Sequence, residues 1–173
     1  MASSRGNPDL DDIVRSMVVL GLIVLALYGV GQFFTRTPEQ PTRSVDWQPA
    51  VESARRSADY PVLAPPSLPD GWRATSARYV PSSGTWTLGV LTDDEEYLGV
   101  EQSTASVTSI VDRVADGGEA AGSAQVADRV WSVTAGPDDR ITYASRVDGV
   151  TTVVTGTTEQ RDLEAYIGTL VDR

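Results

Sequence analysis

A long apolar stretch near the start of the chain is its most pronounced pattern. Residues 16–35 carry no charge and are mostly aliphatic, and Arg15 and Arg36 bracket them. These twenty residues, at about 1.5 Å each in a helix, span roughly 30 Å, the thickness of the hydrocarbon core of a bilayer. The pattern predicts a transmembrane helix over residues 15–35, with the lipid bilayer around it.

The polar segment before this helix, residues 1–14, predicts a short cytoplasmic tail. A cleaved signal peptide is the alternative, but its apolar region is shorter and ends in a small-residue cleavage site that the sequence after Tyr28 matches poorly. Basic residues on the two sides nearly balance, so the expected orientation follows from the short tail. We expect a single-pass protein of the cell membrane whose N-terminus is cytoplasmic.

After the apolar stretch, residues 36–46 are polar and contain two prolines, which predicts a linker. Residues 47–173 then form an extracytoplasmic domain. At its start, Asp46 is a candidate N-cap of a short helix that has Pro49 early in it.

Along this domain, segments in which apolar residues recur with the period of a strand are followed by segments in which they recur with the period of a helix. Alternation of period two between turn residues predicts strands near 72–80, 85–92, 96–103, 129–135, 140–147 and 150–156. Apolar residues at helical spacing predict helices near 106–116 and 158–171, each with one stripe that faces a sheet. Short turns join consecutive strands, so the predicted fold is α+β: an antiparallel sheet of about six strands with helices packed on it, in two βββα halves.

The strongest local signal is Asp148-Gly149, a two-residue loop typical of a type I′ hairpin. This loop places Val147 opposite Val150. Counting outward by twos puts Tyr143 and Val154 on the same face, so the register of the hairpin agrees with its hydrophobic pattern.

Missing residue types restrict the chemistry. The chain has no His, Cys or Lys, and its basic residues are all Arg. Triads and dyads that need imidazole, thiolate nucleophiles, cysteine-based metal sites, Schiff bases and the Walker lysine are therefore excluded. We expect a protein that is not an enzyme, with no catalytic, metal or cofactor-binding residues.

Paired carboxylates are the remaining route to catalysis, as in glycosidases. The densest acidic run is Asp93, Asp94, Glu95 and Glu96, which falls in a predicted hairpin turn and lacks calcium-loop spacing. Asp138-Asp139 also falls in a turn, and Asp9, Asp11 and Asp12 fall in the tail. All three groups are interpreted as solvated charges, and a carboxylate-dependent hydrolase stays a remote alternative.

The four tryptophans can line a groove for sugars or peptides. Trp72, Trp86 and Trp131 lie on predicted strands, where a place in the core is the favoured interpretation, and Trp47 follows the linker. Arg55-Arg56, in the short helix, is interpreted as solvated.

Charge excludes one class of partner. The net charge is -10, and residues 36–173 hold 12 Arg against 21 acidic residues, which gives -9. Nucleic acids and anionic lipid surfaces attract clustered positive charge, so we expect no nucleic-acid binding. The acidity favours solubility, or else complements a basic partner.

One block of sequence is specific enough to suggest a family: Pro61-Val62-Leu63, followed by Leu68-Pro69-Asp70-Gly71-Trp72-Arg73. With the anchor before it, the chain from about residue 13 resembles an actinobacterial family of membrane-anchored proteins filed as a domain of unknown function. The resemblance implies a place in an actinobacterial cell envelope and no activity. The order of strands and helices also resembles the sandwich of the photosystem extrinsic P subunit, whose relatives mostly act as accessory subunits.

These observations favour a non-enzymatic envelope protein whose outer domain binds a protein partner, as an accessory subunit of a larger membrane complex. The alternative is binding of a lipid or glycan, which an apolar pocket or an exposed Trp72 or Trp86 would support.

Overall fold

The computed structural model describes residue 17 and residues 44–172. The chain divides into two compact units, Met1–Pro41 and Thr42–Arg173. The predicted tail, the predicted transmembrane helix over 15–35 and most of the predicted linker lie outside the described residues. Within the ranges that are described, no helix is long and apolar enough to cross a membrane.

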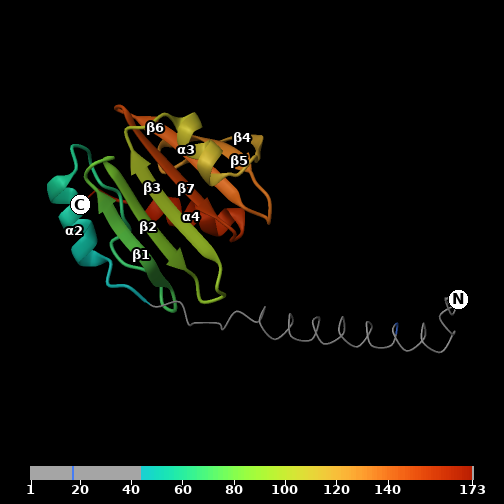
Figure 1. Cartoon of the computed structure of the whole chain (residues 1–173), viewed down its shortest axis with the longest axis horizontal. Helices are drawn as coiled ribbons and strands as arrows, with labels where there is room; N and C mark the ends of the chain where they lie inside the picture. Colours follow the sequence, from blue (N-terminus) through green and yellow to red (C-terminus); the bar gives the residue numbers. More distant parts are fainter. Residues whose placement is uncertain (1–16, 18–43, 173) are drawn as a thin grey trace, which may run out of the picture. The chain divides into compact units, whose positions relative to one another are not determined.

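A single antiparallel sheet of seven strands organises the second unit (Figure 1). The strands are β1 (Arg73–Val80), β2 (Thr85–Leu91), β3 (Tyr97–Ser103), β4 (Glu119–Val126), β5 (Arg129–Ala135), β6 (Ile141–Val147) and β7 (Val150–Gly156). Their order across the sheet is β1-β2-β3-β7-β6-β5-β4, so β1 and β4 form the two edges. The predicted α+β fold is confirmed.

Three helices cover the two faces of the sheet unequally. Helices α2 (Gln48–Ser57) and α4 (Gln160–Thr169) pack on the core face, which carries Leu88, Val100 and Val154 side by side across β2, β3 and β7. Helix α3 (Val107–Val114) packs on the opposite face, which we call the open face.

Large aromatic residues fill the core. Trp86 and Trp131 are 0% and 2% exposed, and Tyr143 lies edge-on to Trp131 with ring centroids 6.5 Å apart. Buried indole N–H groups need acceptors, and the one of Trp86 donates to the Leu63 carbonyl at 3.1 Å. This bond holds the proline-rich segment before β1 against the sheet.

The predicted hairpin between β6 and β7 is confirmed. Asp148 and Gly149 have φ of 49° and 82°, as a type I′ turn requires. Val147 pairs with Val150, and Tyr143 pairs with Val154 on the core face. The other four predicted strands and the helices predicted near 106–116 and 158–171 also form, with ends that differ by a few residues.

Strand β4 is the element that the hydrophobic pattern did not predict. Its sequence, EAAGSAQV, has no alternation because the strand lies at an edge and most of its side chains are exposed. The two halves are therefore unequal, with three strands before α3 and four before α4. The non-glycine residues Ala127 and Asp128, with φ of 50° and 60°, form the turn into β5.

The capping prediction at Asp46 was wrong. The N-cap residue of α2 is Trp47, which has helical backbone angles and gives no side-chain cap. Asp46 is one position too early, and its Oδ1 accepts only a 3.4 Å bond from the Gln48 N–H. Pro49 does lie in the first turn, as predicted.

Candidate functional site

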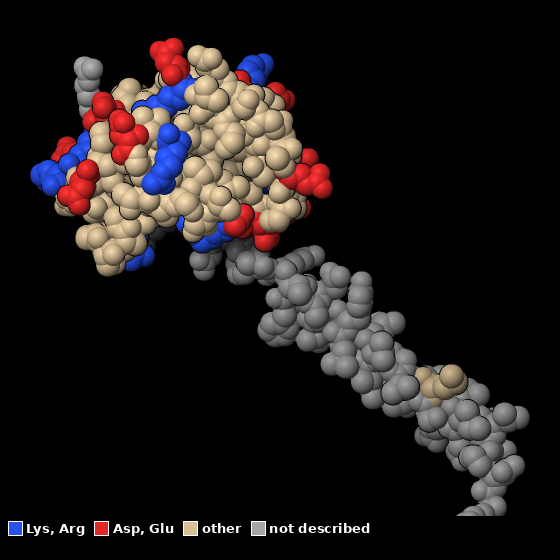
Figure 2. Space-filling view, turned by 90° about the horizontal axis from the view of Figure 1, so that it is seen from above, with Lys and Arg blue, Asp and Glu red and all other residues tan. Residues whose placement is uncertain are grey.

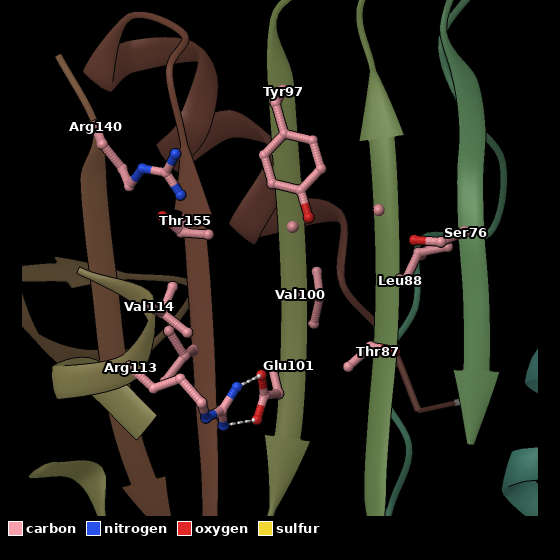
Figure 3. A pocket seen from close by; sticks show the side chains of 13 residues that line it. Ser76, Thr87, Leu88, Tyr97, Val100, Glu101, Arg113, Val114, Arg140 and Thr155 are labelled. Carbon is pink, nitrogen blue, oxygen red and sulfur yellow. Dashed lines mark hydrogen bonds and ion pairs between the residues drawn. The ribbon is translucent and has the colours of Figure 1, made fainter. Parts of the chain in front are cut away.

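Half of the open face is covered by no helix of the described residues. Helix α3 covers β6 and β7, where Ile110 packs against Ala144 and Val153. The part of the open face over β1, β2 and β3 is left uncovered, and a cavity of about 220 Å³ lies there beside α3 (Figure 3). We call it the open-face cavity.

Two glycines form the floor of this cavity. Gly89 on β2 pairs with Gly99 on β3, and the ring of Tyr97 lies over both. A Cβ atom at Gly99 would sit 2.6 Å from the Tyr97 hydroxyl, and one at Gly89 would sit 2.6 Å from Ser76 Oγ. The absence of side chains on the floor is therefore what allows the tyrosine to lie flat on the sheet.

An ion pair closes one side of the cavity. Arg113, at the end of α3, donates to both carboxylate oxygens of Glu101 on β3 at 2.9 Å and 2.5 Å (Figure 3). These bonds raise the pKa of Arg113. A two-point contact of this kind fixes the helix on the sheet and satisfies both charges.

The other side of the cavity carries a cation without a partner. Arg140 directly precedes β6, and its guanidinium extends toward Tyr97 (Figure 3). Within the described ranges its side chain makes no hydrogen bond or ion pair. Burial raises the pKa of the Tyr97 hydroxyl, and the charge of Arg140 opposes that rise.

Arg140 also lines a second cavity, of about 450 Å³, at the end of β6. Its acidic residues are Glu96, Asp139 and Glu159, and Thr157 and Thr158 line it as well. The two cavities therefore share one lining residue, Arg140, and the lining of the first is net positive while that of the second is net negative.

A third cavity, of about 410 Å³, lies beside the hairpin of β6 and β7. The amide of Gln102, 2% exposed, reaches its wall. That amide accepts from the Leu63 N–H at 2.6 Å and donates to Thr152 Oγ1 at 3.2 Å. The polar groups of the Gln102 amide thus hold the segment before β1 against the sheet.

The outer edge of β4 is a second type of exposed surface. The Val130 carbonyl on β5 accepts from Ser145 on β6 at 3.0 Å, so it points away from β4. Since hydrogen-bonded and non-bonded pairs alternate along an antiparallel ladder, Gln125, opposite Val130, directs its N–H and C=O outward. The same holds two residues earlier for Ser123.

The two edges of the sheet differ. Beside β1 lies α2, and the Val45 N–H donates to the Ala74 carbonyl of β1 at 2.8 Å. No backbone group of the described residues bonds to the outer side of β4. The eight residues of β4 carry one charge, on Glu119.

The candidate residues from the sequence lie apart from these surfaces, with few exceptions. Residues 93–96 form the turn between β2 and β3, where Glu95 bonds twice to Arg73 at 2.6 Å, and Asp138 and Asp139 form the turn before β6. Of the acidic candidates, Glu96 and Asp139 reach a cavity wall. In the part of the chain that is described, no three His, Cys, Asp or Glu residues are placed to hold a metal ion.

The tryptophans belong to the core, as the pattern on the strands predicted. Trp86 and Trp131 are buried, Trp72 is half-buried with its ring 6.0 Å from that of Tyr166, and Trp47 packs at the margin. A sugar-binding platform of exposed Trp86 is therefore absent.

The prediction for Arg55-Arg56 holds for one residue of the two. Arg56 is exposed, but Arg55 donates to the carbonyls of Val62 and Val171 at 3.3 Å and 3.0 Å, so it ties α2 to the end of the chain. Sequence reasoning missed Arg140, Tyr97 and the edge of β4, because none of them belongs to a recognisable motif.

The face of the domain in Figure 2 has acidic and basic side chains scattered between large neutral areas. It shows no large patch of either sign. On this face the charges are thus distributed, and the local environment of each surface decides what it attracts.

Comparisons with known proteins give a family without an activity. A family model described as a protein of unknown function (DUF4245) matches residues 5–170. No curated protein matches the chain. Among solved structures, the MucA/MucB complex of Pseudomonas aeruginosa is similar at 14% identity and a TM-score of 0.32. That match covers 63% of this chain and 34% of the other, so this chain spans about a third of its length.

Proposed function

We propose, for a chain that belongs to the DUF4245 family of proteins of unknown function, that its domain is a non-enzymatic protein-binding module. It takes an extended segment of a partner as an eighth strand beside β4. The observation that carries this proposal is the outer edge of β4, which is unpaired among the described residues and where Ser123 and Gln125 direct backbone groups away from the sheet. Strand addition uses such backbone groups and therefore selects a polypeptide over a lipid or glycan.

The composition of β4 supports a partner strand. Proteins that avoid edge pairing place Lys, Pro or inward charges on their edge strands. Residues 120–126 have none of these, and their side chains are small apart from Gln125 and Val126. The bulge between Ala120 and Gly122 limits regular pairing to the last five residues of the strand.

Charge indicates what the partner segment carries. Asp116, Glu119 and Asp128 flank the edge, and the chain as a whole has a net charge of -10. An added strand with one or more basic side chains therefore fits better than an acidic one.

The available chemistry supports binding without catalysis. The sequence has no His, Cys or Lys, so the common bases and nucleophiles are missing from the whole chain. The described carboxylates lie mostly in exposed turns or in ion pairs.

We further propose that the chain is a single-pass protein of the cell membrane, anchored by residues 15–35, with the domain outside and acting as an accessory subunit of a membrane complex. The uncharged run of residues 16–35 supports this location. Ser83, exposed in the turn between β1 and β2, tests it when replaced by Cys in this Cys-free chain. An impermeant maleimide should label the Ser83→Cys protein in intact cells, and labelling by permeant reagents alone would refute the orientation.

Site-specific photocrosslinking tests the edge. A photoreactive residue at position 125 of the full-length protein should give a discrete adduct in cells, and the same residue at Glu52, beside the other edge, should not give that adduct. Ser123→Pro removes an outward N–H and should abolish the adduct, whereas the matched Ser123→Ala should retain it.

The two variants also need to be equally folded for the comparison. Because the Ser123 N–H has no partner in the described part of the domain, we expect Ser123→Pro to match Ser123→Ala in its circular dichroism and thermal midpoint. A full adduct in a folded Ser123→Pro protein, or the same adduct from position 52, would exclude strand addition at β4.

A further inference from the structure

The open-face cavity has the opposite charge from the domain that holds it. Two Arg and one Glu are the charged residues of its lining, so its net charge is +1, against -10 for the chain. The charges of Arg113 and Glu101 satisfy each other through two hydrogen bonds. Of the charges in this lining, that of Arg140 is the one that the described residues hold in no ion pair.

Two hydroxyls in the lining of the open-face cavity have free hydrogen-bonding capacity. Among the described residues, neither the Tyr97 hydroxyl nor Ser76 Oγ makes a hydrogen bond, and both face the open-face cavity with Arg140 (Figure 3). Tyr97 is 38% exposed. A guanidinium that no carboxylate holds in an ion pair, with a hydroxyl donor in the same cavity, is an arrangement suited to a planar anion.

From this arrangement we propose that the open-face cavity is a binding site for a carboxylate group, held by Arg140 with the Tyr97 hydroxyl as a second donor. The site is independent of the strand proposed to add at β4. It lies on the face of the sheet, whereas that strand adds to an edge.

The surroundings favour a carboxylate over a phosphate. Glu96, Asp139 and Glu159 line the adjoining cavity on the other side of Arg140. Their charges repel an incoming anion, and they repel a dianionic phosphate more strongly than a carboxylate of charge -1. The small volume of about 220 Å³ fits one such group with a short side chain attached.

Titration of the full-length, isotope-labelled protein in lipid nanodiscs tests the site. The probe is the tripeptide Gly-Glu-Gly, acetylated and amidated so that its one carboxylate is the glutamate side chain. We expect saturable shifts of the Gly89, Gly99 and Tyr97 amides, with a dissociation constant of about 1–10 mM. The matched Gly-Gln-Gly probe should bind at least about tenfold more weakly.

Substitutions assign the effect to the cavity. Arg140→Gln should weaken binding of the glutamate probe about tenfold or more, Arg140→Lys should retain part of it, and Arg56→Gln, a control on α2, should leave it unchanged. Tyr97→Phe should weaken it about threefold while the ring stays in place. If Arg140→Gln is unfolded, the binding measured for Tyr97→Phe and Arg140→Lys decides whether the glutamate probe binds in the open-face cavity.

Three results would overturn the inference. They are equal shifts with the glutamine probe, glutamate binding unaffected by Arg140→Gln in a folded protein, and tighter binding of inorganic phosphate than of the glutamate probe. Loss of the crosslink at β4 would leave these measurements unaffected, so the two proposals fail separately.

Discussion

Removing the hydroxyl of Tyr166 should make the domain more stable. This hydroxyl is buried and has no hydrogen-bond partner among the described residues, and the tyrosine as a whole is 3% exposed on α4. Burial raises the pKa of the phenol. A buried polar group without a partner costs about 1–3 kcal/mol, so Tyr166→Phe should recover part of that energy while the ring keeps its contact with Trp72.

Tyr60 provides the matched control. Its hydroxyl lies 2.9 Å from the Gly84 carbonyl and 3.0 Å from the Gln102 carbonyl, to which it donates. Removing it loses a hydrogen bond worth about 1 kcal/mol and leaves two carbonyls less well satisfied. Tyr60→Phe should therefore lower the free energy of unfolding by about 1–2 kcal/mol, and Tyr166→Phe should raise it by about 1 kcal/mol.

Urea unfolding of the full-length protein in detergent, followed by tryptophan fluorescence, measures both. A change of 1 kcal/mol corresponds to a shift of about 3–6 °C in the thermal midpoint for a unit of this size, which gives a second readout. A loss of more than about 1 kcal/mol on Tyr166→Phe would refute the reasoning, because it would mean that the hydroxyl is satisfied.

Three further predictions concern pH and packing. Burial raises the pKa of Tyr60 to about 12, so the stability that the neutral phenol contributes is complete below pH 10 and is lost as the pH rises toward 12. The urea midpoint should therefore be lower at pH 11 than at pH 9, and this difference should be smaller in Tyr60→Phe. Hydrogen bonds from Gln160 and a neighbouring tyrosine lower the pKa of Glu164. The stability that the ionised Glu164 adds is therefore present above the ordinary pKa of a glutamate and is lost as the pH falls through the lowered value. In urea midpoints taken from pH 6 to 3, Glu164→Gln should weaken the dependence of stability on pH. Gly156→Ala should cost about 1–3 kcal/mol in urea unfolding, because its Cβ would lie 2.9 Å from a backbone carbonyl, whereas Gly99→Ala should cost less, since only the end of a side chain must move.

Much of the fold could be predicted because local signals and burial agree. Asp148-Gly149 fixes a turn whose register places Tyr143 and Val154 on the buried face, so two independent signals select one hairpin. The stripe of α4 is similarly explicit, with Leu163 and Ile167 buried. These features depend on residues close together in the sequence.

Strand β4 could not be predicted because its side chains are mostly exposed, so burial imposes no hydrophobic pattern on them. An edge strand with both faces largely exposed needs no alternation, and its turn uses Ala127-Asp128 without glycine. Backbone hydrogen bonds to β5 define the strand, and the sequence does not display them.

The open-face cavity could not be predicted because its parts are distant in the sequence. Gly89, Gly99 and Arg140 meet only after β2, β3, β7 and β6 have paired. A glycine in a strand indicates that something approaches closely, but it does not identify Tyr97 as the group that does so.

Amide hydrogen exchange on the edge of β4 tests the central claim most directly. In the purified full-length protein, the Ser123 and Gln125 amides should exchange rapidly, while those of Ala124 and Val126, bonded to β5, exchange slowly. In the complex isolated from the membrane, the Ser123 and Gln125 amides should slow by about a hundredfold or more, the protection that a hydrogen-bonded strand provides. Unchanged exchange of these two amides in a complex that contains the partner would contradict strand addition at β4.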